Sequence, residues 1–229
     1  MRIAILSHGL SVGVGISVGK NIVATLPKIA PQHEYLITVP PHLGYETHDR
    51  EKNVSVIKIK PMSLFKRPYF DLLVLPKLAK RFNPDVIVGL GNMGLIKPPC
   101  KQVILFHQPQ LVYPLEHYNR KLYGYMIRCK ILLLKKIIRT CLRYTQIVFC
   151  QTPIAKERFS KTFKFPSKQI KLMPNAVSEF IDIPQVDIIK PSIYEHDMYF
   201  NLFFLASYYP HKNLEILIDM FRTHREHLH

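Results

Sequence analysis

The stretch "LSVGVGISVGKNIVATL", Leu10–Leu26, directly follows the apolar run "RIAILS", Arg2–Ser7. The run is typical of a β-strand and the later part of the stretch is typical of a helix, so Gly13, Gly15 and Gly19 fall around a strand-to-helix turn. Glycines at such a turn let backbone N–H groups face an anion at the positive end of the helix. They are also what a tight turn requires, so the loop alone leaves both interpretations open.

Two common phosphate-binding patterns do not fit this loop. A P-loop fails because Val14 stands where its first glycine belongs, five residues before Gly19, and Asn21 replaces its hydroxyl residue. A dinucleotide fingerprint fails because Val18 stands where the third glycine belongs. The next predicted strand, "YLITVPPHLG" at 35–44, also lacks the acidic residue that would hold a ribose. We therefore do not expect an NAD-dependent enzyme.

The remainder of the chain alternates strand-like and helical patterns. Runs that are apolar on both faces are typical of parallel sheets covered by helices, so the expected fold class is a doubly wound α/β domain. A helix over 68–82 should be kinked or split by Pro76. Further strands are expected at 33–39, 53–60, 84–92, 101–107, 146–152 and just before residue 174.

Composition limits the partners and the compartment. The 229 residues include 32 Lys and Arg against 16 Asp and Glu, a net charge of +16, which predicts an anionic partner: nucleic acid, an anionic membrane or a phosphate-bearing substrate. The 4 cysteines follow neither a C-x-x-C nor a zinc-site pattern. No apolar run is long enough to span a bilayer, and the N-terminal run is too short for a secretory signal. We expect a cytoplasmic protein with reduced thiols and no bound metal.

The texture of the sequence changes near residue 178. The segment 178–200 contains Pro184 and Pro191, has no clear period and is interpreted as a linker or domain crossing. A strand at 201–207 and a further helix follow it. A second α/β domain needs about 100 residues or more, so we expect an N-terminal Rossmann-like domain at 1–177 and only the incomplete start of a second Rossmann-like domain at 201–229.

Three later motifs, in order, carry a resemblance to a known family. The strand in "VILFHQPQLVYP" ends at His107, the strand before residue 174 ends in "PNAV" at 174–177, and the strand at 201–207 leads to Lys212 and Asn213 at the start of a helix. With the glycine loop before them, these motifs resemble family 4 glycosyltransferases of the two-domain GT-B fold, over residues 1–226. That resemblance implies transfer of a hexose from a nucleotide sugar to a glycan or lipid-linked acceptor, with retention and without a metal or other cofactor.

The resemblance also implies residue roles. His107 would be the catalytic residue that faces the transferred sugar, Gly13 and Gly15 would offer backbone N–H groups to the donor diphosphate, and Lys212 would be a cationic clamp on that diphosphate. Asn175 and Asn213 are secondary candidates. Asn175 fits a turn better than a ligand contact, and Asn213 fits a helix cap better.

Some positions depart from the family pattern. "Ala206-Ser207" stands where the family often has Gly-Arg, Ala176 replaces a glycine, and the acidic E-x7-E motif of the donor pocket would lie beyond residue 229. Activity of this chain alone is therefore expected to be impaired. The alternative hypothesis is a non-catalytic remnant or subunit that binds the acceptor or an anionic membrane and needs a partner chain to complete the donor site.

A basic helix is predicted at 121–144. On a helical wheel one face gathers Leu122, Met126, Cys129, Leu133, Ile137 and Cys141, while Leu132 and Leu142 lie among the basic residues of the other face. Such a helix fits the inner surface of an anionic membrane, or it is the solvated face of a sheet-covering helix. Nucleic acid is not expected, because stacking aromatic residues are not interleaved with the charges. The candidate membrane-contact residues are Lys121, Arg128, Lys135, Lys136, Arg139 and Arg143.

Overall fold

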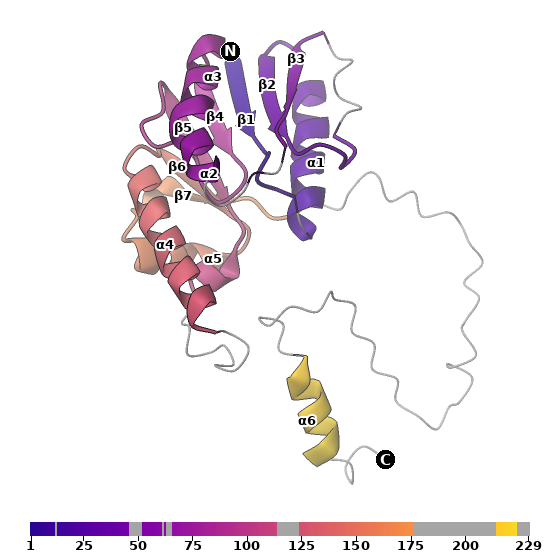
Figure 1. Ribbon diagram of the computed structural model, residues 1–229, viewed down its shortest axis with the longest axis vertical. Coiled ribbons are helices and arrows are strands. Elements are labelled where there is room, and N and C mark those ends of the chain that lie inside the picture. The colour runs from indigo at the N-terminus through magenta and orange to yellow at the C-terminus, as the bar shows by residue number, and fades with distance from the viewer. Residues whose placement is uncertain are drawn as a thin grey trace, which may run out of the picture.

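The computed structural model describes residues 1–11, 13–45, 52–60, 62, 66–113, 124–175 and 214–223. A seven-stranded sheet forms its centre, with the order β3-β2-β1-β4-β5-β6-β7 and every neighbouring pair parallel (Figure 1). The strands are β1 (Arg2–Leu6), β2 (Glu34–Val39), β3 (Val54–Lys58), β4 (Val86–Gly89), β5 (Lys101–Phe106), β6 (Ile147–Cys150) and β7 (Ile170–Leu172). The predicted doubly wound α/β fold is confirmed.

The helical segments connect these strands. They are α1 (Val14–Ile29), α2 (Lys66–Tyr69), the π-helix η2 (Phe70–Val74), α3 (Leu75–Phe82), the 3-10 turn η3 (Pro109–Leu111), α4 (Tyr125–Leu142), α5 (Pro153–Phe163), the 3-10 turn η5 (Ser167–Gln169) and α6 (Glu215–Thr223). The kink or split predicted at Pro76 is found as a change of helix type: the π-helix Phe70–Val74 runs directly into α3, which has the proline in its first turn, and the backbone stays helical at Val74 and Leu75. Asn83 ends α3 in the left-handed conformation, with its N–H bonded to Ala79 and Lys80.

The two faces of the sheet bury different helices. On one face Val23 of α1 packs with Ile5 and Ile37. On the other face α3 packs against β1 and β4, while α4 and α5 cover β5 and β6, as in the cluster of Ile138, Phe159 and Phe106 (Figure 1). Strand side chains alternate between these faces, so the central strands β1, β4 and β5 contribute to cores on both faces. That double burial explains why the sequences of these strands are largely apolar.

Topology sets where a ligand can bind. The chain builds β1, β2 and β3 toward one edge, then crosses back to place β4 on the other side of β1. In open α/β sheets, ligands bind outside the carboxyl ends of the strands at such a reversal. The glycine loop follows β1 and His107 follows β5, so both lie at that end of the sheet.

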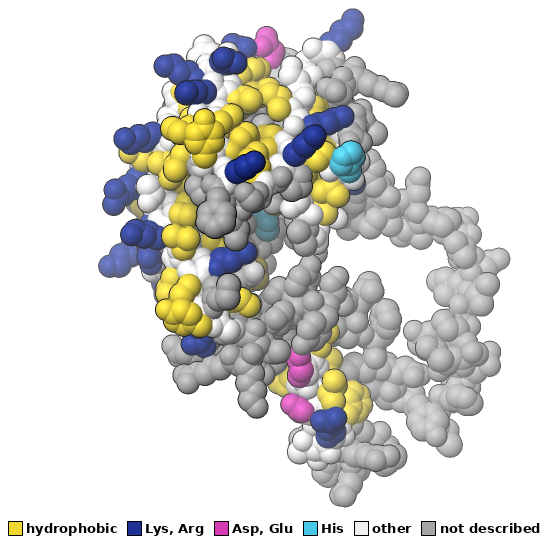
Figure 2. All heavy atoms as spheres, in the orientation of Figure 1, with side chains coloured by type: hydrophobic (Ala, Val, Ile, Leu, Met, Phe, Trp, Pro, Cys, Tyr) yellow, Lys and Arg dark blue, Asp and Glu magenta, His cyan; other side chains and the backbone are white. Residues whose placement is uncertain are grey.

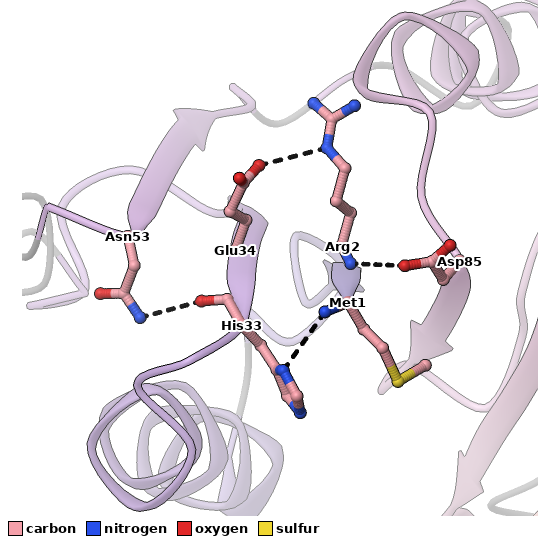
Figure 3. Close-up of polar contacts among 6 residues, drawn as sticks. All are labelled: Met1, Arg2, His33, Glu34, Asn53 and Asp85. Carbon is pink, nitrogen blue, oxygen red and sulfur yellow. Dashed lines mark hydrogen bonds and ion pairs between the residues drawn. The ribbon is translucent and has the colours of Figure 1, made fainter.

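The opposite, amino-terminal edge is held by local polar contacts (Figure 3). The backbone N–H of Arg2 donates to Asp85 Oδ2 at 2.8 Å, and Arg2 Nε pairs with Glu34 Oε2 at 3.2 Å. Asn53 Nδ2 donates to the carbonyl of His33 at 3.0 Å. These contacts join the starts of β1, β2, β3 and β4. The polar residues at this edge therefore have structural roles.

The wheel proposed for the basic helix is wrong about which face is buried. In α4 the buried side chains are Ile131, Ile138, Cys141 and Leu142, whereas Leu133 lies 59% exposed. Cys129 is also exposed, and Leu142 does not lie among solvated charges. The helix carries aliphatic residues at most angles, so its sequence alone fits several burial faces. Packing against Phe106, Val148 and Phe159 selects the observed one.

The predicted domain division stays a prediction. The linker at 178–200 and the strand at 201–207 lie outside the described residues, as do Lys212 and Asn213. Within 201–229 the structure describes residues 214–223, which contain α6, and its Ile216, Ile218, Met220 and Phe221 are exposed.

Candidate functional site

The glycine loop and His107 meet at the carboxyl edge of the sheet. A Cβ atom added to Gly15 would lie 3.6 Å from His107 Nε2 and 3.2 Å from Leu10 Cδ2. Gly15 is in the first turn of α1, and His107 follows the last residue of β5. Two of the residues singled out from the sequence are therefore in direct proximity, although 92 positions separate them along the chain (107 − 15).

The amino terminus of α1 is open to an anion. Its N-cap, Gly13, has φ 62° and ψ −149°, a region that only glycine occupies readily. No side chain in the described part of the chain caps this end, and its first turn contains no acidic residue. The partial positive charge of the helix is therefore not neutralised by the helix's own side chains. Together with the glycine at position 15, this arrangement suits a phosphate group.

His107 is partly buried and held from its backbone. Its N–H donates to Asn92 Oδ1 at 2.8 Å. Its Nδ1 atom is buried and has no hydrogen-bond partner among the residues that the structure describes. Burial lowers the pKa of His107 below its ordinary value of 6.5, so the imidazole is neutral at pH 7. A neutral imidazole can donate one hydrogen bond and accept another, so Nε2, the ring nitrogen beside Gly15, is suited to bond a polar ligand.

Asn92 is a site residue that the sequence analysis did not identify. It lies buried in the loop after β4 with φ 66°, and its Nδ2 donates to Gln108 Oε1 at 3.4 Å. Its backbone N–H also donates to the carbonyl of Leu105 at 3.2 Å. Asn92 therefore links the ends of β4 and β5 and fixes the backbone at His107. The signal available in the sequence was a polar residue between glycines directly after an apolar strand.

His8 was also missed, and its contacts are structural. The buried ring lies with Nδ1 2.9 Å from Thr38 Oγ1 and Nε2 3.7 Å from Asp71 Oδ1. It also contacts the edge of Phe70, with ring centroids 5.9 Å apart. Both nitrogens face neighbours on β2 and η2, so His8 joins the π-helix to the end of β1.

An apolar groove of about 420 Å³ runs along α1 beside the candidate site. Its floor comes from β4, β5 and β6, and α1 forms one wall. His107 lies two residues after Leu105 of this floor, on the face that the period of two gives to Val103 and Leu105. The lining residues are Val18, Asn21, Ile22, Thr25, Leu26, Ile29, Val88, Leu90, Val103, Leu105, Phe149, Met173, Pro174 and Asn175.

The remaining candidates have different positions. Asn175 lies at the end of the groove, where its Oδ1 accepts a hydrogen bond from Gln151 Nε2 at 2.6 Å. Lys121, Lys212 and Asn213 lie outside the described residues. Among the described residues no group of three or more His, Cys, Asp or Glu side chains is arranged to hold a metal ion. In the same part of the chain, no helix is both long and apolar enough to cross a membrane.

The lowered pKa of His107 predicts a pH dependence of stability. The unfolded chain takes up this proton at a higher pH than the folded chain, so acidification from about pH 7.5 to about pH 5.5 should lower the free energy of unfolding. His107→Gln should reduce that loss, as measured by urea unfolding across this range. If the free energy of unfolding of the variant fell with acidification as much as that of the wild type, this would contradict the burial of an ionisable ring at this position.

Comparisons with known proteins give structural likenesses. No protein-family model matches the sequence, and no curated protein matches it. The fold is similar to HepE (Alr3699) of Anabaena, solved with UDP and glucose, at 13% identity and a TM-score of 0.48, over 77% of this chain and 45% of that one. A glycosyltransferase from Rickettsia africae gives 14% identity and a TM-score of 0.44, over 77% and 43%. The lipopolysaccharide outer core galactosyltransferase WaaB gives 16% and 0.47, over 83% and 50%. The chain spans about half the length of these proteins.

Proposed function

We propose that this chain forms the acceptor-side domain of a glycosyltransferase that moves a hexose from a nucleotide sugar to a glycan or lipid-linked acceptor. The observation that carries the proposal is the proximity of Gly15 and His107 at the carboxyl edge of the sheet. This places a helix terminus that suits an anion next to a neutral imidazole. Sugar transfer from a nucleotide sugar can use both, because the leaving group is a diphosphate and the transferred group carries hydroxyls.

Each residue has a chemical task in this proposal. The backbone N–H groups around Gly13 and Gly15 bind the diphosphate and stabilise the negative charge that grows on it as the sugar leaves. His107 forms a hydrogen bond with a sugar hydroxyl and orients the sugar, which lowers the entropic cost of reaction. Lys212, a candidate from the sequence, supplies a positive charge to the same diphosphate. No side chain is assigned to a metal, and retention of configuration is part of the proposal.

Nucleotide binding tests the proposal. Titration calorimetry with UDP, GDP and ADP should give saturable binding to one of them. Gly15→Val should weaken that binding at least about tenfold, because its methyl groups would occupy the space between α1 and His107. Lys212→Ala should weaken it as well. Gly124→Val is the matched control, because a Cβ at Gly124 meets nothing within 4 Å among the described residues.

The outcomes separate the two hypotheses. Binding by the wild type and the control, but not by Gly15→Val, supports the phosphate site, and transfer assays with nucleotide sugars then measure activity. Equal binding by all three proteins would contradict the site. Binding without transfer would favour the alternative, a non-catalytic subunit that relies on a partner chain for the donor half of the reaction.

A further inference from the structure

Two helical segments on the sheet face opposite α1 expose large apolar side chains. In α4, Leu132 and Leu133 are each 59% exposed. In η2, Leu72 and Leu73 are each 50% exposed. Tyr69 at the end of α2 and Tyr125 and Ile127 at the start of α4 are exposed as well. We call these seven residues the apolar surface. Isolated exposed leucines need no explanation, but neighbouring pairs on two adjacent elements do.

The two elements are neighbours in space. Both η2 and α4 pack on the same side of the sheet, through Phe70 in one core cluster and Ile131 and Ile138 in the other (Figure 1). Burial chiefly raises the pKa of Cys141 in α4 to about 11, and the charge of Asp71 in η2 adds to that rise. The apolar surface therefore consists of two groups of residues on this side of the sheet, one on α2 and η2 and the other in the first part of α4.

Basic residues surround the apolar surface. The segment 66–82 contains five basic residues and one acid, Asp71, which lies against His8. The helix α4 and the residue after it contain six basic residues and no acid. Figure 2 shows basic and hydrophobic side chains interleaved on this side of the molecule, with few acidic side chains among them. The basic residues whose side chains the structure describes are Lys66, Lys77, Lys80, Arg81, Arg128, Lys130, Lys135, Lys136, Arg139 and Arg143.

Not all basic residues of α4 are available to a partner. Arg139 donates from Nη2 to the carbonyl of Thr162 at 3.2 Å and lies over the ring of Phe163, so it is directed toward α5. Lys135 is partly buried, and that burial lowers its pKa. Lys130, Lys136 and Arg143 are exposed. Lys130 was not among the candidates named from the sequence, whereas Lys136 and Arg143 were.

We propose that this side of the molecule, formed by α2, η2 and α4, docks on the surface of an anionic lipid bilayer. Leucine pairs interspersed with lysine and arginine give a helix that inserts aliphatic groups between lipids while its charges meet the headgroups. The excess of basic residues complements phosphate-bearing lipids and gives a salt-dependent attraction. A nucleic acid is the competing occupant, and the vesicle and RNA binding measurements distinguish the two.

Docking in this way places the candidate site near the membrane. α4 follows β5 and runs back antiparallel to the strands, so its first turns lie toward the carboxyl edge, where His107 is. Tyr125, Ile127, Leu132 and Leu133 belong to that first part of the helix. A bilayer held there would present headgroups beside the carboxyl edge of the sheet. The docking itself does not depend on the proposed transfer reaction.

Vesicle sedimentation tests the proposal with the full chain. Vesicles of phosphatidylglycerol and phosphatidylcholine in equal parts should sediment the wild type, and pure phosphatidylcholine vesicles should not. High salt should reduce the binding. The quadruple variant Leu72→Gln, Leu73→Gln, Leu132→Gln, Leu133→Gln should bind at least about tenfold more weakly, because its apolar insertion is lost. Lys130→Gln with Lys136→Gln and Arg143→Gln should reduce the binding and its salt dependence.

A matched control uses exposed apolar residues elsewhere. Ile29 is 70% exposed in the groove at the other face, and Leu172 is exposed on β7. Ile29→Gln with Leu172→Gln should bind vesicles as the wild type does. All substituted leucines are solvent-accessible, so each variant should keep the wild-type thermal transition. Equal binding to both vesicle types, unchanged binding of the quadruple variant, or binding to single-stranded RNA in place of vesicles would overturn the proposal.

Discussion

Replacement of Gln102 by leucine is expected to lower the free energy of unfolding by about 3 kcal/mol, because it leaves buried backbone groups without partners. Gln102 is fully buried at the start of β5. Its Oε1 accepts from the N–H of Leu95 at 2.6 Å, and its Nε2 donates to the carbonyl of Leu95 at 3.2 Å and lies 3.3 Å from Thr145 Oγ1. Leucine has a similar volume but none of these groups.

The cost is large because of how the chain passes from β4 to β5. Residues 90–100 make this connection without a helix, so their backbone groups are not satisfied by a helical hydrogen-bond ladder. The Gln102 side chain takes the place of such a ladder at Leu95, because it bonds both the N–H and the carbonyl of that residue. Gly94 leaves the room, since a Cβ there would collide with the Gln102 side chain. The same connection contains Asn92, so loss of Gln102 should also weaken the hydrogen bond from the His107 N–H to Asn92 Oδ1.

Gln146→Leu is the matched control for Gln102→Leu. Gln146 Oε1 accepts from the backbone N–H of Gln102 at 2.6 Å, but the residue is exposed and water can take its place. Urea unfolding should show a loss of less than about 1 kcal/mol for this control and no change in the slope with denaturant for either variant. Equal losses of unfolding free energy for the two variants would show that burial does not make the hydrogen bonds of Gln102 contribute more than that of Gln146.

The fold was predictable from sequence because its strands are buried on both faces. Runs such as "RIAILS" and "KQVILFH" have no polar alternation, and that pattern fits few architectures other than a covered parallel sheet. The burial face of α4 was not predictable. Its aliphatic residues occur all around the helix, and only the positions of Phe106 and Phe159 decide that Ile138 is inside and Leu133 is outside.

The candidate site was predictable only in part, for a related reason. Gly15 and His107 each follow a strand, so topology alone places both at the carboxyl edge. Asn92 lies between glycines after an apolar strand, but that pattern does not indicate its bond to His107, and no local pattern marks the bonds of Gln102 to Leu95. The apolar groove has the same origin. Its floor residues look like ordinary strand residues, and it exists because α1 covers only part of that sheet face.

Gly19→Ala is expected to lower the free energy of unfolding by about 2 kcal/mol, although alanine is the better helix former. A Cβ at Gly19 would lie 2.5 Å from Tyr45 Oη and 2.8 Å from Leu10 Cδ1. Tyr45 is fully buried, and its hydroxyl donates to the carbonyl of Ile16 at 3.2 Å, so it cannot simply turn aside. Gly91→Ala is the matched control, because its Cβ would approach nothing closer than 3.9 Å, and it should change stability by less than about 0.5 kcal/mol.

A double-mutant cycle shows whether the contact with Tyr45 causes this loss. In a Tyr45→Phe background the hydroxyl is absent, and Gly19→Ala should then cost at least about 1 kcal/mol less than in the wild type. An unchanged cost would place the strain elsewhere. The outcome bears on the glycine loop as a whole, because each of its three glycines is required for a different reason. Gly13 provides a backbone conformation, Gly15 leaves space beside His107, and Gly19 lets α1 pack closely on Tyr45. Only the first two face the proposed diphosphate, so Gly19→Ala should reduce stability while the nucleotide affinity of the folded protein stays the same.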